Sequence, residues 1–116
     1  MQPIQIELWT DELNGACYVE DFLGLRQVDG AEILQVLIED FEGRYYAELY
    51  RGNKVKNPLD DLIYLCIDHK DKEVRLFGCL RGRTIVLVHG IAKKMHTRTP
   101  IGEVEKAAER IKRIPN

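Results

Sequence analysis

The chain has 116 residues, of which 45% are apolar and 31% charged, and a formal net charge of −2. This composition is ordinary for a globular protein and argues against disordered and fibrous classes. We expect a single domain spanning residues 1 to 116, because a chain of this length buries about two-thirds of its unfolded surface but is too short for a second core.

The chain begins with a predicted strand and a predicted short helix. The segment IQIELW, residues 4–9, alternates apolar and polar side chains and then meets TDELNG, which indicates a strand that ends in a turn or a helix start. The next segment, ACYVEDFLGL at residues 16–25, has apolar side chains at roughly helical spacing. It therefore predicts a short helix.

A second helix is expected to begin near Asp29. Asp29 followed three residues later by Glu32 resembles a capping box, and apolar side chains then repeat along one helical face. The same face continues to Leu49, which leaves open a helix that runs on to Gly52 or one that is broken at Gly43. The Gly, Asn, Pro and Asp content of residues 52–61 predicts a loop.

Three strand-like segments follow this loop. They are joined by HKDK and by an Arg-Gly pair, and both spacings fit hairpin turns, so we predict an antiparallel meander with strands near residues 62–68, 73–80 and 83–92. The third segment is apolar on both faces, as expected of a strand that is covered on both sides. Thr99 and Pro100 fit the N-cap and first position of an amphipathic C-terminal helix.

These elements predict an α+β fold. We expect a small antiparallel sheet, made of the three-strand meander and the N-terminal strand, packed with the N-terminal helices and a C-terminal helix. The apolar runs are far shorter than the roughly twenty residues that span a bilayer, and MQPIQIELW lacks the layout of a signal peptide. We therefore expect a cytoplasmic protein with no membrane contact.

The cysteines give no sign of a disulfide framework or a metal site. Cys17, Cys66 and Cys79 are odd in number and include no CxxC pair, which fits neither a set of disulfides nor a zinc knuckle. We expect no metal and no cofactor. Cys66 and Cys79 lie in strand-like segments and are interpreted as small buried apolar residues.

The modest net charge hides a division between the two halves of the chain. Residues 1–61 carry five basic and thirteen acidic side chains, a net −8, whereas residues 62–116 carry twelve basic and six acidic side chains, a net +6. No carboxylate side chain occurs between Glu73 and Glu103. Such a block either pairs with the acidic half in the fold or faces a polyanion.

The stretch VRLFGCLRGRTIVLVHGIAKKMHTRTPIGEVEKAAERIKRI, residues 74–114, carries a family resemblance. An arginine-bearing strand, a turn, an apolar strand ending in His-Gly, a Lys-Lys pair, a Thr-Pro helix start and a basic final helix follow one another. In this order the chain resembles the RelE superfamily of toxins, in particular its phage-derived HigB-like branch. PLDDLIY is loosely similar to the family's entry to the sheet, and for residues 1–57 only the order of elements fits.

The resemblance implies the toxin of a bacterial type II toxin–antitoxin pair. Such toxins bind the ribosomal A site and cut mRNA there, and a partner antitoxin, often a helix-turn-helix protein, holds them silent. The implied chemistry is metal-free: the 2′-hydroxyl attacks the adjacent phosphate, and basic side chains stabilise the developing charge. Ribosome, mRNA and antitoxin are the expected partners.

Carried over by position, the resemblance implies catalytic roles for Arg75, Lys93 and Lys94. Arg75 matches the family's strand arginine, and the two lysines match its pair after His-Gly. His96 lies in a polar loop beside Lys94 and is a candidate acid or base, because its unperturbed pKa is near 6.5. The further candidates for RNA contact are Lys70, Lys72, Arg81, Arg83 and Arg98.

Each candidate also has a structural interpretation. Arg75 is two residues from Glu73, with which it would form an ordinary surface ion pair. Lys93 and Lys94 point in opposite directions if the strand keeps its period of two, so only one of them reaches a concave face. We expect His89 on the Ile85, Leu87 and Ile91 side of its strand, as a hydrogen-bonded core residue.

One departure from the family keeps a second function open. The first strand of the family's meander usually carries a Glu-Leu-Arg-like stretch, whereas this chain has Leu65, Cys66 and Ile67 there, so one cationic phosphate ligand is missing. The alternative is a non-catalytic, phage-derived interaction protein on the same fold, which binds an antitoxin-like partner or RNA without cutting it.

Overall fold

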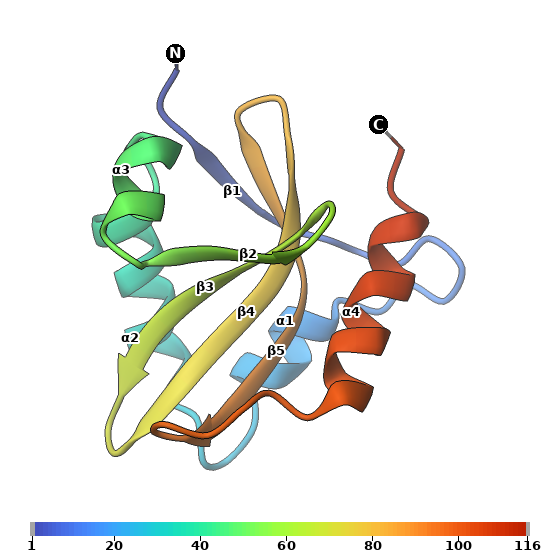
Figure 1. The fold of residues 1–116 in the computed structure, drawn as a ribbon. Helices are drawn as coiled ribbons and strands as arrows, with labels where there is room; N and C mark the ends of the chain where they lie inside the picture. The colour runs from blue at the N-terminus through green and yellow to red at the C-terminus, as the bar shows by residue number, and fades with distance from the viewer. Residues whose placement is uncertain (1, 116) are drawn as a thin grey trace.

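The structure is a computed structural model that describes residues 2–115. It is an α+β fold with a five-stranded mixed sheet and four α-helices, and the strand order is β1-β5-β4-β3-β2 (Figure 1). The elements in chain order are β1 (Gln5–Leu8), α1 (Tyr18–Leu23), α2 (Gly30–Val36), the π-helical turn η1 (Leu37–Phe41), α3 (Tyr46–Arg51), β2 (Val55–Leu59), β3 (Leu62–His69), β4 (Lys72–Arg81), β5 (Thr84–Lys94) and α4 (Ile101–Lys112).

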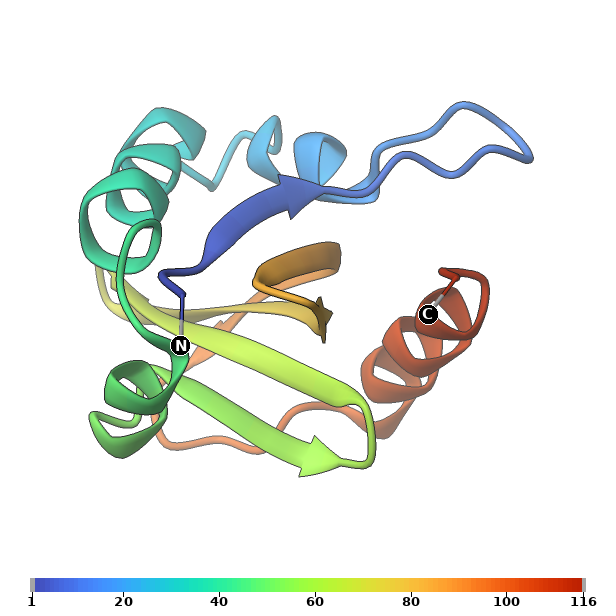
Figure 2. The ribbon, with the colours of Figure 1, turned by 90° about the horizontal axis from the view of Figure 1, so that it is seen from above.

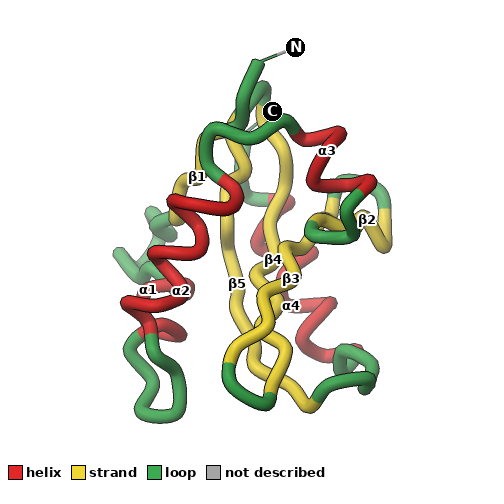
Figure 3. Tube along the Cα trace, turned by 90° about the vertical axis from the view of Figure 1, so that its left-hand side faces the viewer, coloured by secondary structure: helices red, strands yellow, loops and turns green. Residues whose placement is uncertain are grey.

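Helices cover the sheet on both faces. In Figures 2 and 3, α1 and α2 lie on one side of the sheet and α4 lies on the other. Because successive strand residues point to opposite faces, the strands contribute side chains to two separate apolar clusters, one on each face of the sheet. One joins Phe22, Ile33 and Phe41 of the N-terminal helices to Leu65, Leu76 and Leu87. The other joins Ala107 and Ile111 of α4 to Tyr64, Phe77 and Val88.

The predicted meander is confirmed, but the prediction of a wholly antiparallel sheet is wrong. β3, β4 and β5 pair antiparallel through two tight turns, in which Lys70 and Gly82 have φ of 58° and 61°. β1, in contrast, runs parallel to β5, with Gln5 opposite Thr84. The reason is topological: most of the chain intervenes between these two strands, so no hairpin fixes their relative direction.

Residues 52–61, predicted as a loop, contain the edge strand β2. Val55 pairs with Leu65, and the register shifts between Lys56 and Leu59, the interval that contains Pro58. Proline lacks the N–H group that a ladder needs and is tolerated on an edge strand or at an irregularity. The turn-like composition of this segment therefore hid a short strand.

The predicted start of the second helix is confirmed. The Asp29 carboxylate accepts a hydrogen bond from the Glu32 N–H at 3.2 Å, and the Asp29 N–H in turn donates to Nε2 of buried His69 at 3.2 Å. The helical segment is interrupted around Gly43, whose φ is 83°, before α3 begins. The break at Gly43 is therefore the correct alternative.

A bulge in β5 corrects the placement of His89. Phe77 pairs with His89 and Gly78 with Leu87, so Val88 is the extra residue. This insertion moves His89 to the Phe77 side of the sheet, facing α4, instead of the predicted Ile85 and Leu87 side. Sequence alternation cannot reveal such a shift.

Glycine is required at Gly78, beside this bulge, because the backbones approach too closely for a side chain. A Cβ atom there would lie 2.0 Å from the carbonyl oxygen of Val86.

Among residues 2–115, no helix combines the length and the apolar character needed to cross a membrane.

Candidate functional site

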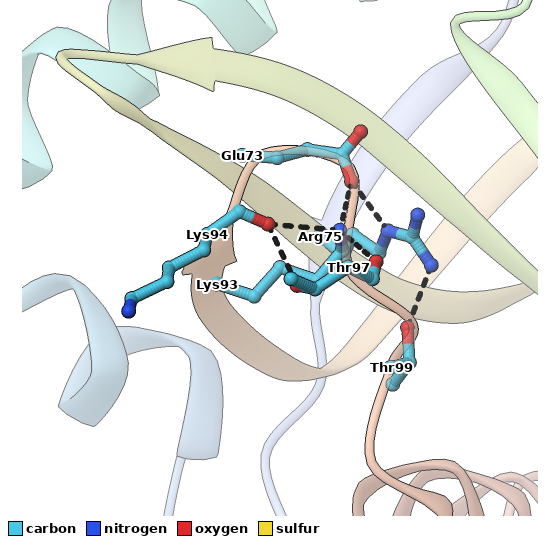
Figure 4. Close-up of polar contacts among 6 residues, drawn as sticks. All are labelled: Glu73, Arg75, Lys93, Lys94, Thr97 and Thr99. Carbon is cyan, nitrogen blue, oxygen red and sulfur yellow. Dashed lines mark hydrogen bonds and ion pairs between the residues drawn. The ribbon is translucent and has the colours of Figure 1, made fainter.

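One carboxylate bridges two cations at the end of the sheet where β5 leads toward α4. The β4–β5 register places Glu73 directly opposite Lys93, and Arg75 lies two residues further along on the same face. One oxygen of Glu73, Oε2, lies 2.8 Å from Nε of Arg75 and 2.9 Å from Nζ of Lys93 (Figure 4). Two neighbouring strands thus bring two of the predicted catalytic residues together around Glu73. The ion pair of Arg75 with Glu73 that the structural interpretation expected is confirmed, although it is largely buried instead of lying on the surface.

The loop after β5 supplies the remaining contacts of this cluster. Nη1 of Arg75 donates to the Thr99 hydroxyl at 2.6 Å, and Nζ of Lys93 donates to the carbonyl oxygens of Thr97 and Lys94. The prediction of Thr99 as the N-cap of the last helix is wrong. Pro100 occupies that position and makes no side-chain cap, while the Thr99 hydroxyl accepts from Arg75 instead.

Burial and charge together fix the protonation of Glu73. The side chains of Glu73, Arg75 and Lys93 are 19%, 15% and 7% exposed. Burial alone would raise the pKa of Glu73, but hydrogen bonds from Lys93 and Arg75, together with their charges, outweigh it and hold the pKa below its ordinary value. Glu73 is therefore ionised at neutral pH.

Two further neighbours define the surroundings of the cluster. The Arg75 guanidinium lies over the ring of Tyr64, 4.5 Å from its centroid, which keeps the arginine flat against the sheet. Glu73 also lines a cleft of about 430 Å³ together with Lys54, Lys56, Cys66 and Asp68. Burial, followed by the charge of Glu73, raises the pKa of the Cys66 thiol, so this cysteine is no thiolate nucleophile at neutral pH.

Lys94 lies apart from the cluster. Its side chain extends away from Glu73, Arg75 and Lys93 in Figure 4, and it is exposed whereas Lys93 is buried. The expectation that the two lysines point in opposite directions is confirmed, and Lys93 is the one that meets Arg75. His96 and Arg98 are exposed in the following loop.

Exposed cations nevertheless gather at this end of the sheet. Lys72 pairs with Lys94 in the β4–β5 ladder, and Lys70 lies in the adjoining turn. None of these three lysines, nor His96 or Arg98, forms an ion pair with another residue in the described part of the chain. The remaining two candidates lie at the opposite end of β4: Arg83 is exposed, and Arg81 is bound to Asp61 at 2.8 Å.

A second polar network, which holds α4, contains His89. Nη1 of Arg110 donates to the Val88 carbonyl oxygen at 3.1 Å and to Nδ1 of His89 at 2.8 Å. Because arginine only donates, Nδ1 is an acceptor, and the neutral ring carries its hydrogen on Nε2, which donates to Glu103. Burial lowers the pKa of His89 in spite of Glu103. Both ring nitrogens are occupied, so His89 is a structural residue.

The same network continues to the N-terminal loop through Asp11. This buried carboxylate accepts from the Leu13 N–H at 3.0 Å, the Tyr18 hydroxyl at 2.9 Å and Nη1 of Arg113 at 2.9 Å. Burial raises its pKa, but these donors outweigh the effect, so the pKa of Asp11 lies below its ordinary value. Arg110 completes the link by lying over the Tyr18 ring at 3.5 Å.

Sequence reasoning missed Glu73 as a site residue because an acid near an arginine is most simply a counter-ion. The signal that reveals it is the hairpin register, which places it opposite Lys93. Among the residues that the structure describes, no three His, Cys, Asp or Glu side chains gather as a metal site would require. No protein-family model, no curated protein and no solved structure matches the chain.

Proposed function

We propose that the chain is a RelE-like toxin of a type II toxin–antitoxin pair, which cuts mRNA on the ribosome and is silenced by a helix-turn-helix antitoxin. The observation that supports this function best is the meeting of Glu73, Arg75 and Lys93 on one face of the sheet. Exposed cations without an ion-pair partner among the described residues lie at the same end of the sheet, on adjoining strand positions and in the neighbouring turn and loop. Cleavage of RNA without a metal needs a proton acceptor and fixed cationic donors. These three side chains supply both.

In the proposed reaction Glu73 accepts the proton of the 2′-hydroxyl. The 2′-oxygen then bonds to the adjacent phosphorus while the bond from phosphorus to the 5′-oxygen breaks. Arg75 and the Lys93 ammonium hold the non-bridging oxygens, on which negative charge develops. The 5′-oxygen leaves with a proton taken from solvent, and the products are a 2′,3′-cyclic phosphate and a 5′-hydroxyl.

Binding of RNA prepares Glu73 for this role. In the free protein Arg75 and Lys93 both bind its carboxylate and make it a weak base. A phosphate that engages these two donors draws them from Glu73 and raises its pKa toward the value at which proton transfer is effective. Catalysis then depends on a substrate that competes for the two cations.

Purified protein added to translating ribosomes with a defined mRNA tests the proposal. Primer extension should show cuts within the A-site codon, and induced expression should arrest bacterial growth unless the neighbouring antitoxin gene is expressed as well. Arg75→Ala should abolish both effects. Arg44→Ala, an exposed arginine between η1 and α3, is the matched control and should leave both unchanged. Uncut mRNA with the parent protein contradicts the proposal.

One observation favours the non-catalytic alternative. Glu73 lies where a phosphate would otherwise engage Arg75 and Lys93, so the cluster is already neutralised within the fold. In that case its role is to fasten the loop of Thr97 and Thr99 to the sheet. The parent would then bind RNA or a partner protein without cutting RNA.

A further inference from the structure

The outer edge of β5 changes character half-way along the strand. β1 pairs with β5 only from Thr84 to Leu87, and the Trp9 N–H adds one more bond to the Leu87 carbonyl oxygen. From His89 to Lys94, β5 pairs with β4 alone. This half of the strand is therefore a sheet edge, although the first half of the same strand is interior to the sheet.

The fold protects this edge at its two ends. Arg110 donates to the Val88 carbonyl oxygen, just past the end of β1. At the far end the Lys94 carbonyl oxygen accepts hydrogen bonds from Nζ of Lys93 and from the Thr97 hydroxyl. In the described chain no side chain forms a hydrogen bond with the backbone of Gly90, Ile91 or Ala92. Native proteins usually block a strand edge, because its unpaired N–H and carbonyl groups can pair with another chain.

A groove runs along the unprotected edge. It measures about 310 Å³ and has Phe22 and Leu25 on the α1 side and Pro100 and Glu103 on the α4 side. Gly90 brings the Phe22 ring close to the strand, since a Cβ atom at Gly90 would lie 2.6 Å from that ring. Leu25 is 45% exposed at the rim. The groove thus offers an apolar wall beside open backbone groups.

The charges around the groove that have no partner are positive, because Glu103 of its lining is bound to His89. Lys72 lines it, Lys94 is the cross-strand neighbour of Lys72, and Arg98 follows in the loop; all three are exposed and without an ion-pair partner in residues 2–115. A second copy of this chain would present the same lysine-bearing edge and double the positive charge. Opposite charges stabilise paired strands, whereas like charges destabilise them.

We propose that the His89–Lys94 edge of β5 binds an extended acidic segment of a partner protein as an additional strand. Those backbone groups of Gly90 to Ala92 that point away from β4 pair with the segment, alternate apolar side chains contact Phe22 and Leu25, and its carboxylates face Lys72 and Lys94. This inference does not rest on RNA cleavage. Lys93 belongs to the Glu73 cluster and also lines the groove, but the pairing uses backbone groups of β5 and the charges of Lys72 and Lys94, which lie outside that cluster.

Titration of the full-length, ¹⁵N-labelled protein with synthetic peptides tests the inference. The probe is a ten-residue peptide of alternating Glu and Val, and the control peptide alternates Lys and Val. The acidic peptide should shift the amide signals of Gly90, Ile91 and Ala92 and slow the hydrogen exchange of those among them that point away from β4. The basic peptide should leave them unchanged.

Two charge reversals separate this binding from general electrostatic attraction. Lys94→Glu should weaken the acidic peptide about three- to tenfold, the effect of losing one favourable cross-strand charge pair and gaining a repulsive one. Arg44→Glu makes the same charge change away from the groove and should have no effect. Equal weakening by both variants, equal binding of both peptides, or signal shifts outside the groove would overturn the inference. So would concentration-dependent self-association that protects Gly90 to Ala92.

Discussion

Two ion-pair clusters contact the same face of the sheet and differ in what surrounds them. In the α4 network, Asp11 and His89 are buried and each polar atom has a partner from α4 or the N-terminal loop. In the Glu73 cluster Lys93 is also buried, but the carboxylate adjoins a cleft, and lysines without an ion-pair partner among residues 2–115 lie at the same end of the sheet. The first cluster joins elements that are distant in sequence, whereas the second joins adjacent strands that the sheet already holds together.

This difference separates structural charge from available charge. Arg110 and Arg113 fasten α4 to β5 and to the N-terminal loop, so their loss should act on the fold. Arg75 and Lys93 lie on strands already fixed by backbone pairing, so their loss should act mainly on what the site binds. Four predictions test this division, in order of decreasing expected effect.

The largest expected effect is on RNA cleavage. Arg75→Ala combined with Lys93→Ala removes both cationic donors and should lower the cleavage rate by at least about two to three orders of magnitude, the typical loss for one well-placed donor. The rate is measured with ribosome-bound mRNA and corrected for the folded fraction from circular dichroism. Arg110→Ala is the control and should leave the corrected rate unchanged. A similar fall of the corrected cleavage rate in both variants would contradict the proposed division between structural and available charge.

The next effect is on stability. Arg110→Ala removes hydrogen bonds to Val88 and His89 and the contact with Tyr18, and should lower the free energy of unfolding by about 2 to 3 kcal/mol. Urea unfolding followed by tryptophan fluorescence measures the change. Lys106→Ala, an exposed position on the same helix, is the matched control and should cost about 0.5 kcal/mol or less. Equal losses would show that the Arg110 contacts contribute nothing beyond helix propensity.

Much of the framework was predictable, because its signals are local. The β3–β5 meander follows from alternation and short turns, and the start of α2 follows from Asp29 and Glu32. The parallel pairing of β1 depends on the path of the whole chain, and β2 was hidden by the composition around Pro58. These features follow from tertiary pairing, which a single sequence does not display.

The candidate site was predictable only in part. Strand alternation separated Lys93 from Lys94, and the family resemblance pointed to Arg75. The role of Glu73 needed the pairing register, and the side of the sheet that His89 faces depends on one bulged residue. A shift of one residue reverses every side chain beyond it, so local periodicity fails at such a point.

Acid should destabilise the protein through the carboxylates of both clusters. The folded-state pKa values of Asp11 and Glu73 lie below their ordinary values, so the unfolded chain binds protons first as the pH falls. Their contribution to stability is complete above the unfolded pKa, near 4, and is lost as the pH falls through the folded pKa. Between pH 5 and pH 2 the melting temperature should therefore fall less steeply in Asp11→Asn than in the parent. An unchanged slope would contradict the assignment.

The smallest effect is expected between pH 7.5 and 5.5. Burial holds the pKa of His89 in the folded protein below the ordinary value of about 6.5. As the pH falls, this histidine is therefore protonated in the unfolded chain before it is protonated in the folded protein. The contribution of His89 to the free energy of unfolding is complete above the unfolded pKa, about 6.5, and decreases as the pH falls below it. His89→Gln keeps a donor and an acceptor for Glu103 and Arg110 but does not titrate, and its melting temperature should vary less over this range. A parent that gains stability on acidification would contradict the neutral ring.

The most direct test of the account compares Glu73→Gln with the parent in single-turnover cleavage of ribosome-bound mRNA. Glutamine preserves the shape of the side chain but cannot accept the 2′-hydroxyl proton, and it releases Arg75 and Lys93 from their ion pairs. The account predicts that the cleavage rate falls by at least about a hundredfold, the lower end of the range for general base catalysis. Binding of RNA should not be weakened. Cleavage by the variant at the parental rate or faster would show that Glu73 is only a counter-ion and would contradict the proposed site.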